Sequence, residues 1–305
     1  MTRETRGVHS IDHYALYVPS LPQAQHFFEN FGLDVQASDG QLLLRAGDGR
    51  TWARILPGVA KALAWLSFNC HEHDYLALRR QVEAAGATFE DGDGVGCWFR
   101  DPHGNLLQIK VGDKTMPNCK ATALHTSAYG RVRGVGTRDQ LPRITPARLS
   151  HVLLFSPDVL ASIDFYEQAL GLRLSDKSQD IIAFMHATHG CDHHLVAFAK
   201  SSAKGWHHAA WEVGSIDQVG VGAAQMASAG YHDGWGTGRH ALGSNYFHYV
   251  RDPWGSFCEY SADMDFIAEG VTWPSGDFHP ENSLYLWGPD VPEHFIFNTE
   301  AGAGQ

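Results

Sequence analysis

The chain has 305 residues, which is enough for one large domain or two medium-sized ones. It carries 34 acidic and 23 basic residues, and the resulting net charge of −11 argues against a nucleic-acid or anionic-membrane partner. Five scattered cysteines without a CxxC pair suggest neither a disulfide framework nor a thiolate zinc site. A small organic molecule is the partner that best suits this composition.

The sequence predicts a cytoplasmic protein without a membrane partner. Its first residues lack the basic, apolar and small-residue order of a secretory signal, and no run of about 18 apolar residues could span a bilayer. Histidine is unusually frequent, with 19 residues, and neutral imidazole is the commonest metal ligand. Most of these histidines are expected on the surface or in the core.

The first predicted elements lie in IDHYALYVPSLPQAQHFFENFGLDV, residues 11–35. Alternating apolar residues indicate a strand, and the aromatic-bearing helix that follows is expected to end at Gly32. Further strands follow, then a second amphipathic helix that ends at Ala85 and Gly86. A strand, an Asp-Pro-x-Gly turn that begins at Asp101 and a last strand complete the segment.

The same order of elements returns in the second half. LSHVLLFSPDVLASIDFYEQALGLRL repeats the first strand and helix, and the shift from His13 to His151 is 138 residues. FRDPHGNLLQI is likewise repeated by VRDPWGSFCEY, which places Asp101 and Asp252 in register. The chain is therefore a tandem duplication, and we predict an α+β protein in which each copy is a doubled βαβββ repeat.

The repeat also suggests domain boundaries. We expect an N-terminal domain over 1–114 and a C-terminal domain over 147–265, joined by a linker over 115–146 that is rich in Gly, Arg, Thr and Pro. Residues 266–305 have no counterpart in the first copy. We interpret this tail as a flap over the functional site, with packing or an oligomer contact as an equally weighted alternative.

The two copies differ at three polar positions. His151 corresponds to His13, whereas Glu259, seven residues after its Asp-Pro turn begins, corresponds to Gln108. Alignment of HHAAWEV with AWLSFNC places His208 opposite a tryptophan, Trp65. Only the second copy therefore has two histidines and a carboxylate at these positions.

Two histidines and one carboxylate form the facial triad typical of non-haem iron(II), a set that leaves three coordination positions open. A divalent cation would also compensate a buried Glu259. A single strand histidine or glutamate is more often structural, but three at matching repeat positions reverse that preference. We predict one iron(II) per chain, with manganese(II) as a possible substitute.

These residues resemble the type I extradiol ring-cleavage dioxygenases of the vicinal oxygen chelate superfamily, and the resemblance covers almost the whole chain. It implies that the βαβββ modules form two similar open-barrel domains, of which only the C-terminal one binds iron. It gives His151, His208 and Glu259 as the metal ligands, with His207 a less favoured ligand than its neighbour.

The resemblance also implies catalytic roles for His194 in HHLVAF, His240 in GRH and Tyr249 in YFHYVRDPWG. A histidine can act as acid or base near neutral pH, and hydrogen bonds from the other two side chains would stabilise the substrate oxygens. His193 is the alternative to its neighbour, and hairpin register alone leaves His248 open as an alternative to the tyrosine.

The function that the resemblance implies is extradiol cleavage of a monocyclic catechol. Both atoms of the co-substrate dioxygen enter a product of the 2-hydroxymuconic-semialdehyde type, and the resemblance favours a homo-oligomer, preferably a tetramer. A glyoxalase-type isomerase is one alternative, although Gln108 argues against it because those enzymes use glutamates at more than one closing strand. A non-catalytic protein that binds aromatic ligands is the other, although the intact triad argues against it.

The substrate pocket is expected to suit a neutral ring such as catechol, an alkyl- or chlorocatechol, or a trihydroxylated ring. Apolar residues near the triad positions suggest this, namely Phe184, Met185, Trp206, Phe247 and Phe257. No basic cluster stands out as a clamp for a carboxylated ring, although Arg239 and Arg251 could reach the pocket.

Overall fold

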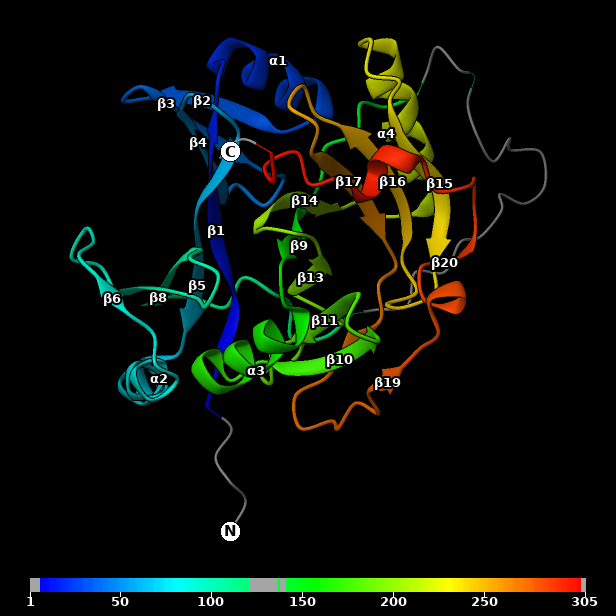
Figure 1. Cartoon of the computed structure of the whole chain (residues 1–305). Helices are drawn as coiled ribbons and strands as arrows, with labels where there is room; N and C mark the ends of the chain where they lie inside the picture. The colour runs from blue at the N-terminus through cyan, green and yellow to red at the C-terminus, as the bar shows by residue number, and fades with distance from the viewer. Residues whose placement is uncertain (1–5, 121–136, 138–140, 303–305) are drawn as a thin grey trace.

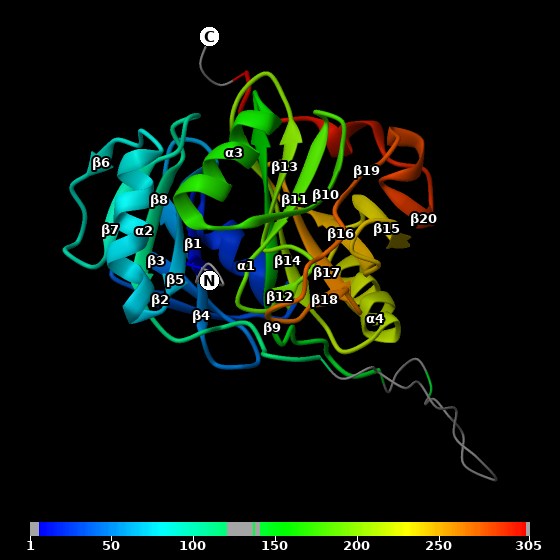
Figure 2. The ribbon, with the colours of Figure 1, turned by 90° about the horizontal axis from the view of Figure 1, so that it is seen from below.

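The computed structural model describes residues 6–120, 137 and 141–302. Two large sheets, one from each half of the chain, lie side by side with helices around them (Figures 1 and 2). This arrangement confirms the predicted α+β class. Within the described ranges, no helix is both long and apolar enough to cross a membrane.

The first half consists of two modules with the same order of elements. The first module contains β1 (Val8–Val18), α1 (Leu21–Phe31), β2 (Asp34–Ser38), β3 (Gln41–Arg45) and β4 (Thr51–Pro57). The second contains β5 (Ala62–Cys70), α2 (Glu72–Ala84), β6 (Phe89–Glu90), β7 (Cys97–Arg100) and β8 (Leu106–Val111). The sheet order is β2-β3-β4-β1-β5-β8-β7-β6, so the opening strands of the two modules pair at its centre.

The second half repeats this plan. Its first module contains β9 (Arg148–Ser156), α3 (Val159–Leu170), β10 (Arg173–Ser178), β11 (Ile182–His186), the short β12 (Cys191–Asp192) and β13 (Val196–Lys200). Its second contains β14 (Gly205–Glu212), α4 (Ile216–Ser228), β15 (Gly234–His240), β16 (Tyr246–Arg251) and β17 (Phe257–Ala262). The predicted doubled βαβββ repeat is thus present in both halves.

The tail adds short elements around the second sheet. It contains β18 (Phe266–Ile267), β19 (Gly276–Asp277), the 3-10 helix η2 (Pro280–Asn282), β20 (Tyr285–Trp287) and the 3-10 helix η3 (Glu293–Ile296). The sheet order is β19-β10-β11-β13-β9-β14-β17-β16-β15-β20, so tail strands occupy both of its edges. The tail therefore covers backbone groups that would otherwise be unpaired at the two edges.

The helix ends follow from the local sequence. Ser20 precedes α1, and its side chain accepts a hydrogen bond from the backbone N–H of Gln23, as an N-cap does. The helix ends at Gly32, whose φ of 102° lies in the left-handed region that glycine adopts without a Cβ clash. The predicted stop at Gly32 is therefore confirmed, and Gly171 ends α3 in the same way with a φ of 69°.

Strand registers reproduce the duplication residue by residue. Trp65 pairs with Ala15 across β5 and β1, and His208 pairs with Leu153 across β14 and β9. Since Leu153 comes 138 residues after Ala15, the two sheets use the same register as the sequence alignment. The closing strands agree as well, with the pairs Ser67–Gln108 and Ala210–Glu259.

The two halves are joined by direct packing as well as by the chain. Tyr260 stacks on Phe31 with ring centroids 4.0 Å apart, and its hydroxyl donates to the Phe31 carbonyl at 2.8 Å. Helix α2 lies beside α3, and α1 lies beside α4 (Figure 1). Most of the predicted linker, 121–136 and 138–140, lies outside the described residues, and the domain boundaries stay a prediction.

A buried ion pair offers a test of what stabilises the second half. Arg148 lies 2.7 Å and Lys120 lies 2.6 Å from the carboxylate of Asp192, which is fully buried. Burial alone would raise the pKa of Asp192, but the two cations hold this pKa below its usual value. The stabilisation is therefore present above pH ~4, the usual value for Asp, and is lost as pH falls through the lower pKa of the folded state.

Replacing Asp192 by Asn should lower the free energy of unfolding by roughly 1–3 kcal/mol, because Arg148 loses its buried partner and keeps only the partly exposed Glu212, 2.5 Å away. Denaturant titration at neutral pH measures the change. Asp180→Asn is the control, because Asp180 pairs with Lys200 at the surface, and its midpoint should match that of wild type. Equal midpoints for both variants would contradict the prediction.

Candidate active site

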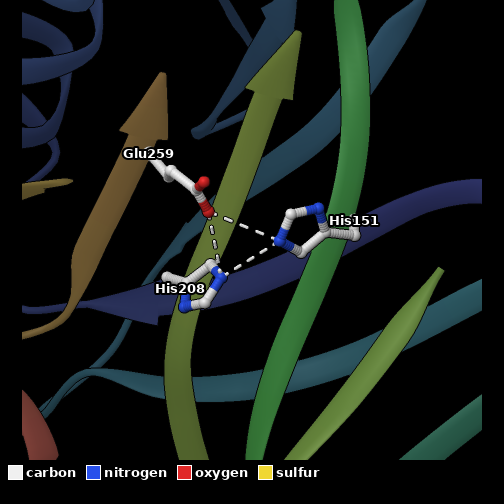
Figure 3. Close-up of side chains that lie close together, drawn as sticks. All are labelled: His151, His208 and Glu259. Carbon is white, nitrogen blue, oxygen red and sulfur yellow. Dashed lines mark hydrogen bonds and ion pairs between the residues drawn. The ribbon is translucent and has the colours of Figure 1, made fainter. Parts of the chain in front are cut away.

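Three neighbouring strands bring the predicted metal ligands together. His151 lies on β9, His208 on β14 and Glu259 on β17, and their side chains point toward one another (Figure 3). The two Nε2 atoms are 3.3 Å apart, and each lies 3.4 Å from Oε2 of Glu259. Three atoms at this spacing can all lie about 2.0–2.2 Å from one ion.

The residues fit a divalent cation. Glu259 is completely buried, and its Oε1 accepts a hydrogen bond from the Asn245 side chain at 3.0 Å. Its Oε2 has no hydrogen-bond partner among the described residues, which is costly for a buried carboxylate unless a cation compensates it. A set of two imidazoles and one carboxylate, with no thiolate, suits iron(II) or manganese(II). Sequence reasoning missed Asn245, because no spacing pattern marks this loop residue.

The first half satisfies the equivalent positions with its own hydrogen bonds. The Trp65 indole donates to Nε2 of His13 at 2.9 Å, which uses the lone pair that a metal would need. The amide of Gln108 accepts from the Ser67 hydroxyl at 2.5 Å and donates to the Val95 carbonyl at 2.9 Å. In the part of the chain that the structure describes, the triad is the one group of three or more candidate ligand atoms within 4.8 Å.

A cavity of about 330 Å³ opens above the triad. His151 and His208 form part of its wall, and the other described residues that line it come from the second half and the tail. Most of them are apolar: Leu153, Phe155, Ile181, Ile182, Phe184, Ala199, Leu242, Pro280, Leu284, Phe295 and Ile296. The cavity therefore offers an apolar surround for a small ring next to the candidate metal ligands.

The three predicted catalytic side chains all line this cavity. His194 packs on the His151 ring with centroids 4.1 Å apart. Tyr249 and His240 form a pair in which the phenol oxygen is 2.8 Å from Nε2. Among the described lining residues, His193 and His248 do not appear, so the geometry favours their neighbours in the sequence. Their catalytic roles stay predictions.

His193 and His207, the histidines considered as alternatives, each contact the next histidine in the sequence, and of the two only His207 is among the described residues that line the cavity. Nδ1 of His193 is 3.1 Å from Nδ1 of His194, and Nδ1 of His207 is 2.7 Å from Nδ1 of His208. Their Nε2 atoms bond groups outside the triad, a carboxylate for His193 and a backbone carbonyl for His207. Both therefore hold a neighbour in place and do not take part in the triad themselves.

Burial sets the charge of the site. It lowers the pKa of His194 and of His208 well below the usual range, and neighbouring histidines lower both further. Burial also lowers the pKa of His240 and raises that of Tyr249 well above its usual value, with Glu259 adding to the latter shift. Neutral imidazoles keep a lone pair for a metal or a proton, and a neutral phenol remains a hydrogen-bond donor.

The predicted pocket residues need correction. Phe184 lines the cavity, but Met185 and Trp206 belong to the main hydrophobic core. Phe247 and Phe257 belong to a second buried cluster instead of the cavity wall. Successive side chains on a strand point to opposite faces, so nearness to the triad in sequence does not place a residue in its cavity.

The two candidate arginines are engaged elsewhere. Arg239 donates to a loop carbonyl at 2.9 Å, and Arg251 pairs with Asp233 at 2.9 Å. Neither appears among the described residues that line the cavity, where Lys200 is the cationic lining residue. Lys200 is half exposed and paired with Asp180, so it lies at the rim. Among the described residues, the deeper wall therefore offers no cation to a carboxylated ring.

The tail lies against the cavity, in agreement with the interpretation that it covers the site. Its described lining residues are Pro280, Ser283, Leu284, Phe295 and Ile296. Phe295 is buried, and its ring lies 4.8 Å from those of Trp235 and Tyr249. Opening and closing of the tail as a flap stays a prediction.

Known proteins match both the sequence and the fold. Residues 148–260 match the family model described as "Glyoxalase/Bleomycin resistance protein/Dioxygenase superfamily". Metapyrocatechase 2 from Cupriavidus necator is 58% identical over 303 residues, which cover 98% of this chain and 95% of that protein. Biphenyl-2,3-diol 1,2-dioxygenase from Pseudomonas sp. (strain KKS102) is 26% identical over 73% of this chain and 79% of that protein.

Among solved structures, homoprotocatechuate 2,3-dioxygenase from Brevibacterium fuscum superposes with a TM-score of 0.76 at 19% identity, over 98% of this chain and 94% of that one. The Mn(II)-bound glyoxalase from Novosphingobium aromaticivorans gives a TM-score of 0.75 at 22% identity, over 95% and 94%. These likenesses concern the fold alone. The sequence matches show that the chain belongs to the glyoxalase/bleomycin resistance protein/dioxygenase superfamily and, within it, to the type I extradiol ring-cleavage dioxygenases.

Proposed function

We propose that this protein is an iron(II)-dependent dioxygenase that opens a monocyclic catechol by extradiol cleavage. Both atoms of dioxygen enter the product, which is of the 2-hydroxymuconic-semialdehyde type. The observation that carries the proposal is the buried His151, His208 and Glu259 triad: one carboxylate oxygen has no hydrogen-bond partner among the described residues, and the two histidines line an apolar cavity. The 58% identity to metapyrocatechase 2 supports it.

His151, His208 and Glu259 would hold the metal, with manganese(II) as a possible substitute for iron(II). An ion held there would bind the two hydroxyl oxygens of a catechol and leave a third position for dioxygen, so that both reactants are held side by side. Asn245 orients the carboxylate through its bond to Oε1. A hydrogen bond to a metal ligand from a neighbouring residue fixes the orientation of that ligand and thereby the geometry of the metal site.

Tyr249, His240 and His194 would handle protons around the bound ring. The Tyr249 hydroxyl lies 2.8 Å from Nε2 of His240, and its oxygen would accept a hydrogen bond from a catechol hydroxyl. His194 is neutral and lines the cavity, so it can take up a proton and return it later in the reaction. Apolar side chains, including Phe184 and Leu242, exclude water from the ring.

The same proposal includes the setting of the enzyme. An activity of this kind belongs to the breakdown of aromatic compounds, and we propose a cytoplasmic homo-oligomer, with a tetramer favoured by family resemblance. Its partners are a small aromatic diol and dioxygen. Size-exclusion chromatography with light scattering measures the oligomeric state.

The cavity lining predicts substrate preference. We expect kcat/KM for catechol, methylcatechols and chlorocatechols to exceed that for carboxylated catechols by roughly 100-fold or more, because a carboxylate buried without a cation loses its hydration. Oxygen-uptake rates across this panel measure the difference. Comparable kcat/KM values for a carboxylated ring would mean that Lys200 or another cation reaches the substrate.

Metal analysis and oxygen uptake together test the proposal. We expect one equivalent of iron per chain, one dioxygen consumed per catechol, and a product heavier than catechol by the mass of dioxygen. Two metal equivalents per chain, or tightly held zinc in the active form, would contradict the metal assignment. Bound metal without oxygen uptake would favour an isomerase, and ring binding without metal or turnover would favour a non-catalytic binding protein.

A further inference from the structure

Two backbone carbonyls of the tail accept hydrogen bonds from buried histidines of the second sheet. The Leu284 carbonyl lies 2.7 Å from Nδ1 of His240, and the Phe295 carbonyl lies 2.8 Å from Nε2 of His207. A carbonyl oxygen can only accept, so the ring nitrogen that faces it must carry a proton. The tail thereby determines the proton position on two imidazoles.

For His240 the consequence is direct. A neutral imidazole carries one proton, and with that proton on Nδ1 the other nitrogen, Nε2, has a lone pair. This Nε2 lies 2.8 Å from the Tyr249 hydroxyl, which must then donate the hydrogen bond. The direction of the bond between these two cavity residues therefore follows from the Leu284 carbonyl of the tail.

For His208 the consequence passes through its neighbour. His207 is buried among the rings of Phe155, Phe257 and Phe295, at centroid distances of 5.0, 5.4 and 4.8 Å, and these apolar surroundings favour a neutral imidazole. Because its proton is on Nε2, its Nδ1 has the lone pair. Nδ1 of His208 lies 2.7 Å away and must donate, which leaves the lone pair of His208 on Nε2, the atom in the triad.

A local irregularity in β14 makes this contact possible. The register of β14 against β9 shifts between Trp206 and His208, so that His207 is an extra residue in the ladder. Such a bulge can bring two consecutive side chains close together, although regular strand neighbours point to opposite faces. The first half has the same shift at the equivalent position, where the extra residue is Ala64. Only the second copy therefore has, at this bulge, a side chain that can hydrogen-bond the tail.

We propose that the C-terminal tail sets the tautomers of two site histidines, His240 directly and His208 through His207. Each then presents an unprotonated Nε2 to the site. With its proton on Nε2 instead, His208 could not bind a metal. His207 is a positioning residue in this scheme, and the tail takes part in metal binding although the triad contains no tail residue. The part that concerns metal rests on the proposed function.

The tautomers are measurable without metal or substrate. Nitrogen-15 spectra of the metal-free protein, labelled at histidine, report which ring nitrogen carries the proton. We expect Nδ1–H for both His208 and His240, with the two signals assigned by their loss in single-site variants. A proton on Nε2 of either residue in wild type would overturn the proposal. This measurement does not depend on whether the protein cleaves catechols, so its failure is distinct from failure of the proposed function.

Substitutions at His207 separate hydrogen-bond polarity from packing. In His207→Gln the amide nitrogen can donate to the Phe295 carbonyl and the amide oxygen can accept from His208, so both bonds keep their direction. His207→Leu suits the apolar surroundings but removes both bonds. Titration of the metal-free proteins with Mn(II) measures the effect. The Mn(II) affinity of His207→Gln should lie within about threefold of wild type, and that of His207→Leu should be about 10- to 100-fold weaker.

His248→Leu is the matched control, because it removes an imidazole from the neighbouring part of the same sheet, where Nδ1 has no partner among the described residues. It should leave Mn(II) affinity unchanged. Wild-type Mn(II) affinity and an unchanged His208 tautomer in His207→Leu would overturn the proposal. Equally weakened Mn(II) affinity in folded His207→Gln and folded His207→Leu would overturn it too. If His207→Leu does not fold, the wild-type spectra and His207→Gln decide the matter.

Discussion

Replacing Glu259 by glutamine is expected to abolish ring cleavage and to weaken metal binding by at least roughly 100-fold. This loss exceeds the usual effect of substituting a residue that only hydrogen-bonds a metal ligand. The carboxylate is completely buried, and its Oε2 lies 3.4 Å from both histidine nitrogens of the triad. Glutamine still offers an oxygen but removes the negative charge that offsets the cation. Anaerobic titration with iron(II) and oxygen uptake with catechol measure the two effects.

The duplication provides the control. Gln108→Glu creates the same carboxylate in the first half, where Trp65 already occupies the lone pair of His13. We expect it to bind no second metal and to lose roughly 1–3 kcal/mol of stability, because a buried carboxylate cannot donate to the Val95 carbonyl as Gln108 does. Full activity of Glu259→Gln, or loss of the original metal in folded Gln108→Glu, would show that the metal site does not lie in the second half of the chain.

Much of the fold and of the triad could be predicted from the sequence because the chain contains two copies of one plan. Equivalent positions in a duplicated sheet have the same register, so a residue pair such as Trp65 and His208 can be compared without a structure. The opening strands pair at the centre of each sheet, and the closing strand lies beside one of them. A histidine on each opening strand and a glutamate on the closing strand therefore meet.

The cavity wall could not be predicted in the same way. Phe295, Leu284 and Ile296 come from a tail that has no counterpart in the first copy, so no internal comparison indicates where they lie. Asn245 lies in a loop before β16, and its bond to the carboxylate depends on backbone geometry that no spacing pattern reports. The contact between His207 and its neighbour depends on a bulge, and a regular strand would have separated the two rings.

Replacing His194 by phenylalanine is expected to slow turnover by about 100-fold or more, which is the usual scale for the loss of a general acid or base. Metal affinity and catechol binding should remain close to those of wild type, because the ring of His194 lines the cavity but its nitrogens are not among the triad atoms. A phenyl ring can keep the packing against His151 and Phe184, whose centroids lie 4.1 and 4.8 Å away.

Three measurements on His194→Phe separate a catalytic role from a structural one: iron content, catechol affinity under anaerobic conditions, and kcat for oxygen uptake. His248→Phe serves as the control, since His248 is not among the described lining residues, and its kcat should match wild type. Loss of iron in His194→Phe would make this histidine a metal ligand, and an unchanged kcat would assign the proton transfer elsewhere. A fall in kcat with normal iron and catechol binding supports the role proposed for His194, because only the reacting state then needs the imidazole.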